Sequence, residues 1–294
     1  MRATAGWLIA IGTGLACAAR IAADGGVSGE FRAGSRAIAP AHAAAFPVRD
    51  PRNPRRTATE VVLSEGPVDV DAAAGELSPH QHVINQKGIG NYILLWVRRD
   101  GEVSMNATFA PTMTQYLDKT GGGGPFAGAL VAELTAAGPE RVAGRVYTPR
   151  PVRMRSAESY QLDLRFDTAV TRPVAGTPLG AHGGPPGQAF SSLYTALASK
   201  NWPAVRSRLS RRTLALLAEG DGPSEEGRAF GLETLGAWLP RKRIKVSAGE
   251  LRGEAAILEV EGESAGGLRA LYLVRMIREA DAWCFDEAAM VGLL

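Results

Sequence analysis

Apolar residues in the last third of the chain recur first at helical spacing and then at strand spacing. Phe190, Leu193, Tyr194 and Leu197 lie at i, i+3, i+4 and i+7, which places them on one face of a helix. The same pattern predicts four helices: 189–200, 203–209 capped by Asn201, a third capped by Ser210, and 227–239. Strands follow from Arg243 onward, over 255–261, 268–278 and 282–287. Helices on one face of an antiparallel sheet form an α+β layer.

The register of the last two predicted strands decides which charged side chains meet. If Arg278 lies opposite Ala282, Asp286 is diagonal to Arg275. If Arg278 lies opposite Trp283, Arg275 and Asp286 face each other. An ion pair between these two side chains would keep Asp286 charged and make it a poor general base.

Residues 59–170 alternate between apolar and polar in a manner typical of strands. They predict an all-β unit, which is a sandwich, a strongly curved sheet or an open barrel. The strongest signal is Asp100-Gly101, because this dipeptide favours a two-residue hairpin turn. Pairing about such a turn places Trp96 opposite Met105. Further strands are predicted over 130–135, 141–148 and 160–166.

The N-terminus has the pattern of an export signal. Arg2 precedes a short apolar run that ends near Ala19, with small residues at the candidate cleavage positions. We therefore expect residues 1–23 to be a signal peptide and the mature protein to be periplasmic or extracellular. Cys17 gives an alternative, because lipidation of its thiol would attach the chain peripherally to a membrane. The residue three positions earlier is Gly14, whereas a lipidation motif has leucine there.

Two segments are rich in glycine and proline and lack periodicity. Residues 24–58 also contain many alanines and arginines, and predict a disordered arm. Residues 171–187 predict a linker. The expected domains are therefore a β-rich domain over 59–170 and an α+β domain over 188–294, each folding separately.

The C-terminal segment resembles the nuclear transport factor 2-like superfamily, in particular its exported bacterial branch. The resemblance rests on the opening helix 194–205, on the strand pair around 253–256, and on Leu273-Val274-Arg275 leading to Trp283-Cys284-Phe285-Asp286. It covers about a third of the chain, and we recognise no family in the β-rich domain. In that superfamily a curved sheet wraps a helix and leaves a conical pocket. The resemblance implies such a pocket without implying an activity.

Several side chains of the C-terminal domain are candidates for lining such a pocket. They are Tyr194, Trp238, Tyr272, Arg275, Trp283 and Asp286. Core packing for the aromatic residues is the alternative interpretation. The domain contains no histidine, so any acid–base chemistry would fall to a carboxylate such as Asp286, with a tyrosine as donor.

Metal, cofactor and nucleic-acid functions find little support in the sequence. His80 and His82 form the only local histidine pair, and on a strand both rings would share a face. Asp69, Asp71 and Glu76 are near enough in sequence to add an oxygen ligand, but the spacing singles out none of them, so neither a metal nor another cofactor is expected. The motifs G-x-S-x-G, H-E-x-x-H and C-x-x-C are absent. The 33 basic and 30 acidic residues nearly balance, which argues against a nucleic-acid partner.

These observations favour an exported, non-catalytic protein of the bacterial envelope or periplasm. Its partner would be a small apolar ligand or an envelope protein. The bacterial source is inferred from the richness in alanine, glycine and arginine. One alternative is an isomerase- or dehydratase-type enzyme that uses a pocket carboxylate. Another is a structural envelope lipoprotein attached through Cys17.

Overall fold

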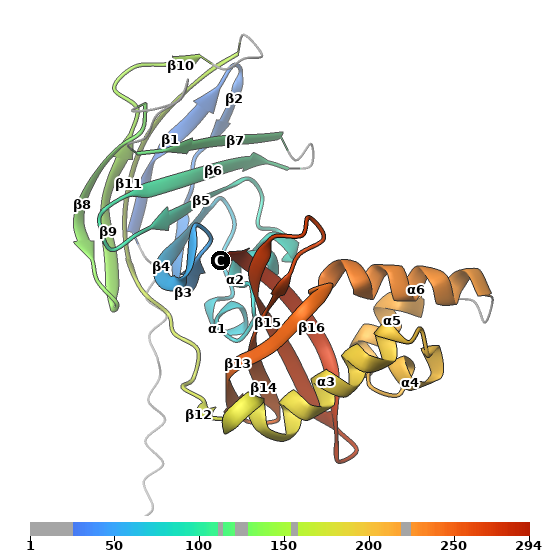
Figure 1. Ribbon diagram of the computed structural model, residues 1–294. Coiled ribbons are helices and arrows are strands. Elements are labelled where there is room, and N and C mark those ends of the chain that lie inside the picture. The colour runs from blue at the N-terminus through green and yellow to red at the C-terminus, as the bar shows by residue number, and fades with distance from the viewer. Residues whose placement is uncertain (1–25, 111–113, 121–128, 154–157, 219–224) are drawn as a thin grey trace, which may run out of the picture.

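The computed structural model describes residues 26–110, 114–120, 129–153, 158–218 and 225–294. They form a mixed α+β fold made mostly of strands, arranged in three antiparallel sheets (Figure 1). The expected signal peptide and Cys17 lie outside these ranges. Within them, no helix has the length and apolar character needed to span a membrane.

The first sheet has the strand order β2-β1-β11-β9-β8, with β10 paired to β11. The bounds are β1 (Gly26–Ala33), β2 (Arg36–Ile38), β8 (Val131–Ala137), β9 (Arg141–Tyr147), β10 (Val152–Arg153) and β11 (Ser159–Ala169). Buried and exposed residues alternate along β11, as expected for a strand with one face against a core. The strands predicted over 130–135, 141–148 and 160–166 are confirmed as β8, β9 and β11.

The second sheet has the order β3-β4-β5-β6-β7. Its bounds are β3 (His42–Asp50), β4 (Asn53–Ser64), β5 (Tyr92–Val97), β6 (Val103–Phe109) and β7 (Thr114–Lys119). One face shares a hydrophobic core with the first sheet, through residues such as Leu63, Leu95 and Leu164. Helices α1 (Val70–Ala74) and α2 (Pro79–Asn85) pack on the opposite face against Val62 and Leu94.

Two sequence predictions fail in this half. The disordered arm over 24–58 is wrong, because residues 26–33, 36–38, 42–50 and 53–64 form strands β1 to β4. The prediction of an all-β unit over 59–170 is also wrong, because α1 and α2 interrupt it. In β3, Ala43 and Ala45 contact one core while Ala44 and Phe46 contact the other. A strand buried on both faces shows no alternation, so its sequence resembles an unpatterned segment.

The third sheet has the order β12-β13-β14-β15-β16. Its bounds are β12 (Thr177–Pro178), β13 (Lys242–Arg252), β14 (Ala255–Glu263), β15 (Arg269–Glu279) and β16 (Ala282–Leu293). One face packs against the helices through a core that includes Phe190, Leu258 and Phe285. The helices are η1 (Ala181–Gly183), α3 (Gly184–Ala198), α4 (Trp202–Arg206), α5 (Arg211–Ala218) and α6 (Glu225–Trp238).

The four predicted C-terminal helices and the last three predicted strands are confirmed, with small differences at their ends. The Asn201 side chain accepts a hydrogen bond from Ala204 N at 3.2 Å, and Ser210 Oγ accepts one from Thr213 N at 3.0 Å, as expected of caps. Helix α3 begins earlier than predicted, at Gly184, so the end of the predicted linker forms its first turn.

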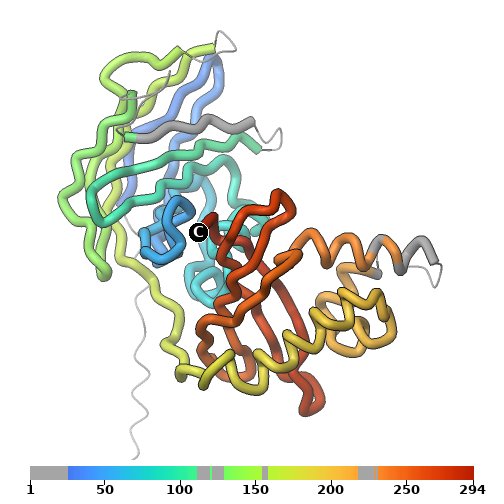
Figure 2. Tube along the Cα trace, viewed as in Figure 1, coloured from blue at the N-terminus to red at the C-terminus, as the bar shows by residue number. Residues whose placement is uncertain are grey.

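The third sheet and the second sheet lie side by side, with α1 and α2 between them (Figure 1). The end of the chain lies beside the β3–β4 turn (Figure 2). A Cβ atom added at Gly292 would come within 2.4 Å of the backbone oxygen of Pro51. The face of the third sheet that points away from α3 to α6 therefore lies against the side of the second sheet that carries α1 and α2.

The β5–β6 hairpin has a different register from the predicted one. Leu95 pairs with Met105, and Trp96 pairs with Ser104. Arg98 N donates to Glu102 O at 2.9 Å, so the loop has three residues rather than two, with Gly101 at φ +84°. The extra loop residue shifts the pairing by one position, so Leu95 and not Trp96 shares a face with Met105. Leu95 and Met105 consequently lie in the core shared with the first sheet.

Replacing Gly101 with valine is expected to lower the free energy of unfolding by about 1–3 kcal/mol. No neighbouring atom lies within 4 Å of a Cβ added there, so the cost comes from the left-handed backbone conformation alone. Urea denaturation of the two proteins measures it. Gly101→Asn is the control and should cost less, because asparagine tolerates this conformation better. Equal stability of Gly101→Val and the wild type would contradict the left-handed assignment.

Candidate functional site

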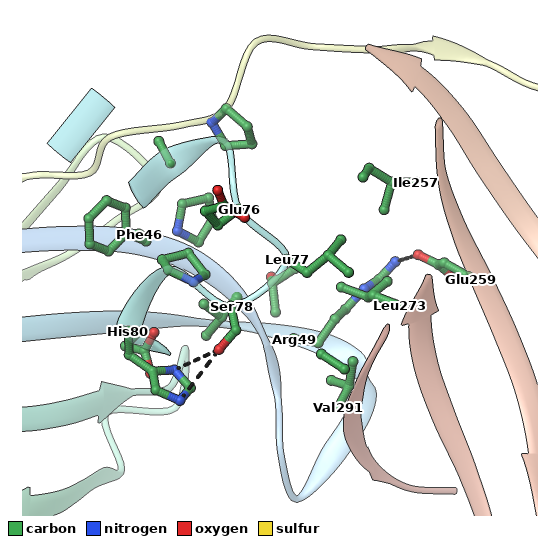
Figure 3. Close-up of a pocket in the computed structure, with 18 of the residues that line it drawn as sticks. Phe46, Arg49, Glu76, Leu77, Ser78, His80, Ile257, Glu259, Leu273 and Val291 are labelled. Carbon is green, nitrogen blue, oxygen red and sulfur yellow. Dashed lines mark hydrogen bonds and ion pairs between the residues drawn. The ribbon is translucent and has the colours of Figure 1, made fainter. Parts of the chain in front are cut away.

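A cavity of about 550 Å³ lies between the second and third sheets, and we call it the intersheet cavity. Its walls come from β3, β4, β5 and the α1–α2 segment on one side, and from β13 to β16 on the other. Figure 3 shows Leu77, Leu273 and Val291 lining its middle. Most of its walls are apolar, so a ligand there would bury largely hydrophobic surface.

Glu60 is a buried carboxylate in the wall of this cavity. It lies in the middle of β4, directly opposite Phe46 on β3 and opposite Trp96 on β5. Opposite residues on neighbouring strands point to the same face, so the carboxylate is flanked by two aromatic side chains. All three residues line the cavity. Glu60 has no exposed surface, which is unusual for a carboxylate.

His80 on α2 lies next to this carboxylate. Its Nδ1 atom is 2.9 Å from Oε1 of Glu60, which is ion-pair distance. The contact lacks the direction of a hydrogen bond, and neither oxygen of Glu60 receives a directed hydrogen bond from the described residues. Burial of the imidazole opposes its charged form, but the adjacent carboxylate more than offsets this and raises the pKa of His80.

Ser78 completes a small polar group at this end of the cavity. Its hydroxyl lies 3.3 Å from Nδ1 and 3.4 Å from Nε2 of His80 (Figure 3). Nearly equal distances to the two nitrogens mean that the hydroxyl is not aligned with the lone pair of either one. Ser78 is therefore not placed as a nucleophile that this imidazole activates.

The other charged side chains of the cavity wall have partners. Arg49 on β3 forms an ion pair with Glu259 on β14, across the gap between the two sheets (Figure 3). Arg252 pairs with Glu250, both on β13. Each of these carboxylates therefore has a guanidinium partner. Glu60 has only an imidazole beside it.

Arg275 forms the centre of a second charged group, which shares Glu76 with the cavity wall. Its side chain is 10% exposed and contacts three carboxylates: Asp286 at 2.8 Å, Glu287 at 2.8 Å and Glu76 at 2.6 Å. Glu76 belongs to the α1–α2 segment, so this contact joins the two halves of the chain. Burial raises the pKa of Glu287, although Arg275 opposes the effect.

The β15–β16 register explains how Arg275 meets these carboxylates. Arg278 lies opposite Trp283, as in the second of the two predicted alternatives, and a bulge then places Glu287 opposite Arg275. Asp286 still contacts Arg275, so the expected ion pair is present. Asp286 also accepts a hydrogen bond from Ser210 Oγ at 2.7 Å. These contacts fit a structural carboxylate rather than a catalytic one.

None of the six residues proposed from sequence lines the intersheet cavity. Tyr272 is in the core beneath the helices, and Trp238 and Trp283 pack against that core. The Tyr194 hydroxyl donates to the backbone oxygen of Arg241. The third sheet thus turns its aromatic residues toward the helices and its other face toward the cavity.

The structure places the histidine pair on a helix rather than on a strand. His80 and His82 are two positions apart on α2, where side chains point in different directions. His82 lies 3.9 Å from Glu76, whereas His80 contacts Glu60. Among the described residues, no three histidine, cysteine or carboxylate side chains are placed so that they could hold one metal ion.

Cys284 is a buried strand residue, and burial raises the pKa of its thiol. A thiol with a raised pKa is a weak nucleophile at neutral pH. Cys284 is therefore a packing residue of β16.

Comparison with known proteins identifies no relative. No protein-family model matches the chain, and neither the curated proteins nor the solved structures contain a significant match. The functional argument therefore rests on the geometry of the cavity.

Sequence reasoning missed Glu60 as a site residue. One available signal was a glutamate next to Val61-Val62-Leu63, where an apolar residue is expected in a strand buried on both faces. A charged residue at such a position requires a specific reason, and a binding site is one.

Proposed function

We propose that the protein is an exported, non-catalytic binding protein that takes up a small, largely apolar ligand in the intersheet cavity. The observation that carries this proposal is the cavity itself. Its volume of about 550 Å³ lies within the range typical of small-molecule sites. Its walls combine apolar side chains with a few polar groups, as ligand pockets usually do.

The proposal keeps the resemblance of the C-terminal half to the nuclear transport factor 2-like superfamily. Two features support that assignment: helices precede the sheet in sequence, and bulges in β13 and β16 bend it. The shared core of the first two sheets supports a sandwich for the other half. The proposed site differs from the expected conical pocket, since it lies on the opposite face of the third sheet.

A cavity-filling variant tests the proposal. Hexanol, octanol and decanol are titrated into the protein by calorimetry, and we expect saturable binding of one molecule per chain. Ala289 lines the cavity on β16, so Ala289→Trp should abolish binding by occupying the space. Ala37→Trp is the control, because Ala37 is exposed on β2 and far from the cavity wall. Equal binding by all three proteins would disprove the proposed site.

An acid–base enzyme is the second candidate, and one observation favours it. The C-terminal segment lacks histidine, but the fold brings His80 from α2 into a cavity against the C-terminal sheet, beside the buried carboxylate of Glu60. Such a pair can move a proton. Turnover of any substrate that is lost in a folded Glu60→Gln variant would place this function first. The envelope lipoprotein remains an alternative that depends on Cys17.

A further inference from the structure

We propose that the ligand of the intersheet cavity carries a positively charged ammonium group, and that Glu60, Phe46 and Trp96 form its subsite. This inference rests on the proposed binding function and specifies the chemistry of the ligand. Its starting observation is a fully buried carboxylate that no directed hydrogen bond from the described residues satisfies.

The ion pair with His80 connects Glu60 on β4 to α2, but it leaves both carboxylate oxygens without a directed hydrogen bond from the described residues. A buried carboxylate that lacks hydrogen bonds is costly, and native proteins keep such groups where function requires them. Thr59 and Val61, the neighbours of Glu60 along β4, are uncharged and so do not call for a carboxylate at this position. The cost is offset if a ligand supplies hydrogen-bond donors and a positive charge.

The side chains around Glu60 suit a cation. Phe46 and Trp96 flank the carboxylate from the neighbouring strands, and aromatic faces attract ammonium groups. An ammonium can therefore donate to the carboxylate and contact aromatic rings at the same time. A neutral ligand would contact the aromatic rings but would bring no positive charge to the carboxylate.

The pairing of the charged side chains in the cavity wall also favours a cationic ligand. Four carboxylates line the cavity, from Glu60, Glu76, Glu250 and Glu259; the last three pair with Arg275, Arg252 and Arg49, and Glu60 alone has an imidazole, that of His80, in place of a guanidinium group. The guanidinium groups of Arg49 and Arg252 are thus already paired with carboxylates of the same wall. Arg252 keeps one buried nitrogen, Nε, without a hydrogen-bond partner among the described residues, but its guanidinium charge is balanced by Glu250, whereas Glu60 has no guanidinium partner.

His80 occupies only part of the coordination space of Glu60. Its Nδ1 atom approaches Oε1, while Oε2 has no contact of this kind with the described residues. The imidazole thus acts as a partial counter-charge for the carboxylate. Because both carboxylate oxygens are buried, an ammonium ligand reaches them by displacing the imidazole.

The size of the cavity limits the rest of the ligand. About 550 Å³ accommodates one molecule with a short apolar chain or a ring system. Leu77, Leu273 and Val291 would contact that apolar part. The ligand class is thus a free organic amine with an apolar body.

Three probes of equal chain length test the inference: decylammonium, decanol and decanoate, each titrated into the wild-type protein by calorimetry near neutral pH. We expect decylammonium to bind about 10- to 100-fold more tightly than decanol, because a charge-assisted hydrogen bond replaces a neutral one. Decanoate should bind most weakly. This ranking needs no variant, so it holds even if a substitution at Glu60 prevents folding.

Variants then assign the preference to one carboxylate. Glu60→Gln should bind decylammonium and decanol with similar affinity, while its affinity for decanol stays near that of the wild type. His80→Gln should keep or increase the preference, since it removes the competing imidazole. Glu250→Gln is the matched control: this carboxylate lines the same cavity but already pairs with Arg252, so the preference should remain.

The possible failures are distinguishable. If decanol binds and decylammonium shows no advantage, or decanoate binds best, the ammonium subsite is wrong and the cavity proposal stands. If the preference survives in a folded Glu60→Gln variant, Glu60 is not the anchor. If none of the three probes binds, the proposed function itself fails.

Discussion

Replacing Arg275 with alanine is expected to lower the free energy of unfolding by about 3–5 kcal/mol. Arg275 is 10% exposed and neutralises Asp286, which is 4% exposed, together with Glu76 and Glu287. Its removal leaves these three carboxylates close together with Arg212, at 3.2 Å from Asp286 and 3.8 Å from Glu287, as the remaining counter-charge. Chemical denaturation followed by circular dichroism measures the loss.

Arg269→Ala is the matched control for this prediction. Arg269 lies on the same strand and also forms an ion pair, with Glu261 at 2.8 Å, but its side chain is 62% exposed. An exposed pair contributes about 0–1 kcal/mol, so this variant should be almost as stable as the wild type. Similar losses in the two variants would show that burial does not set the contribution of Arg275.

Replacing Gly187 with alanine is expected to destabilise the protein by about 1–3 kcal/mol or more. A Cβ atom at this position would lie 1.9 Å from the backbone oxygen of His182 and 2.9 Å from its carbonyl carbon. Both atoms belong to the backbone, so no side-chain rotation can relieve the overlap. The start of α3 must move, and thermal unfolding monitors the consequence.

Gly236→Ala is the control, since it makes the same substitution inside another helix. No neighbouring atom lies within 4 Å of a Cβ added at Gly236 on α6. Alanine favours helix more than glycine does, so this variant should gain up to about 1 kcal/mol. The two substitutions should therefore change stability in opposite directions. A Gly187→Ala protein as stable as the wild type would contradict the close approach to His182.

Local patterns predicted the C-terminal half well. Helices and strands with one buried face carry a clear period, as in Phe190, Leu193 and Leu197 on α3. Caps such as Asn201 and Ser210 also act locally and are readable from the sequence. The Arg275–Asp286 contact followed from one of two registers, and the bulge that accompanies it has no evident sequence signal.

The N-terminal strands and the site were harder to predict, because long-range packing determines them. Ala43 to Phe46 show no alternation since both faces of β3 are covered, by the first sheet and by α1 and α2. The hairpin register depended on one additional loop residue at Gly101. Glu60 and His80 are far from the C-terminal sheet in sequence, and only the fold brings them to one cavity with it.

The origin of the cavity walls has a consequence for dissecting the protein. Glu60 and His80 come from the N-terminal half, whereas Ile257, Leu273 and Val291 come from the C-terminal half. A recombinant fragment that contains either half would present half a concave surface open to water. Grafting one half onto another protein would likewise transfer no complete recognition surface. Ligand specificity is thus a property of the joined chain, and the two halves are constrained to vary together.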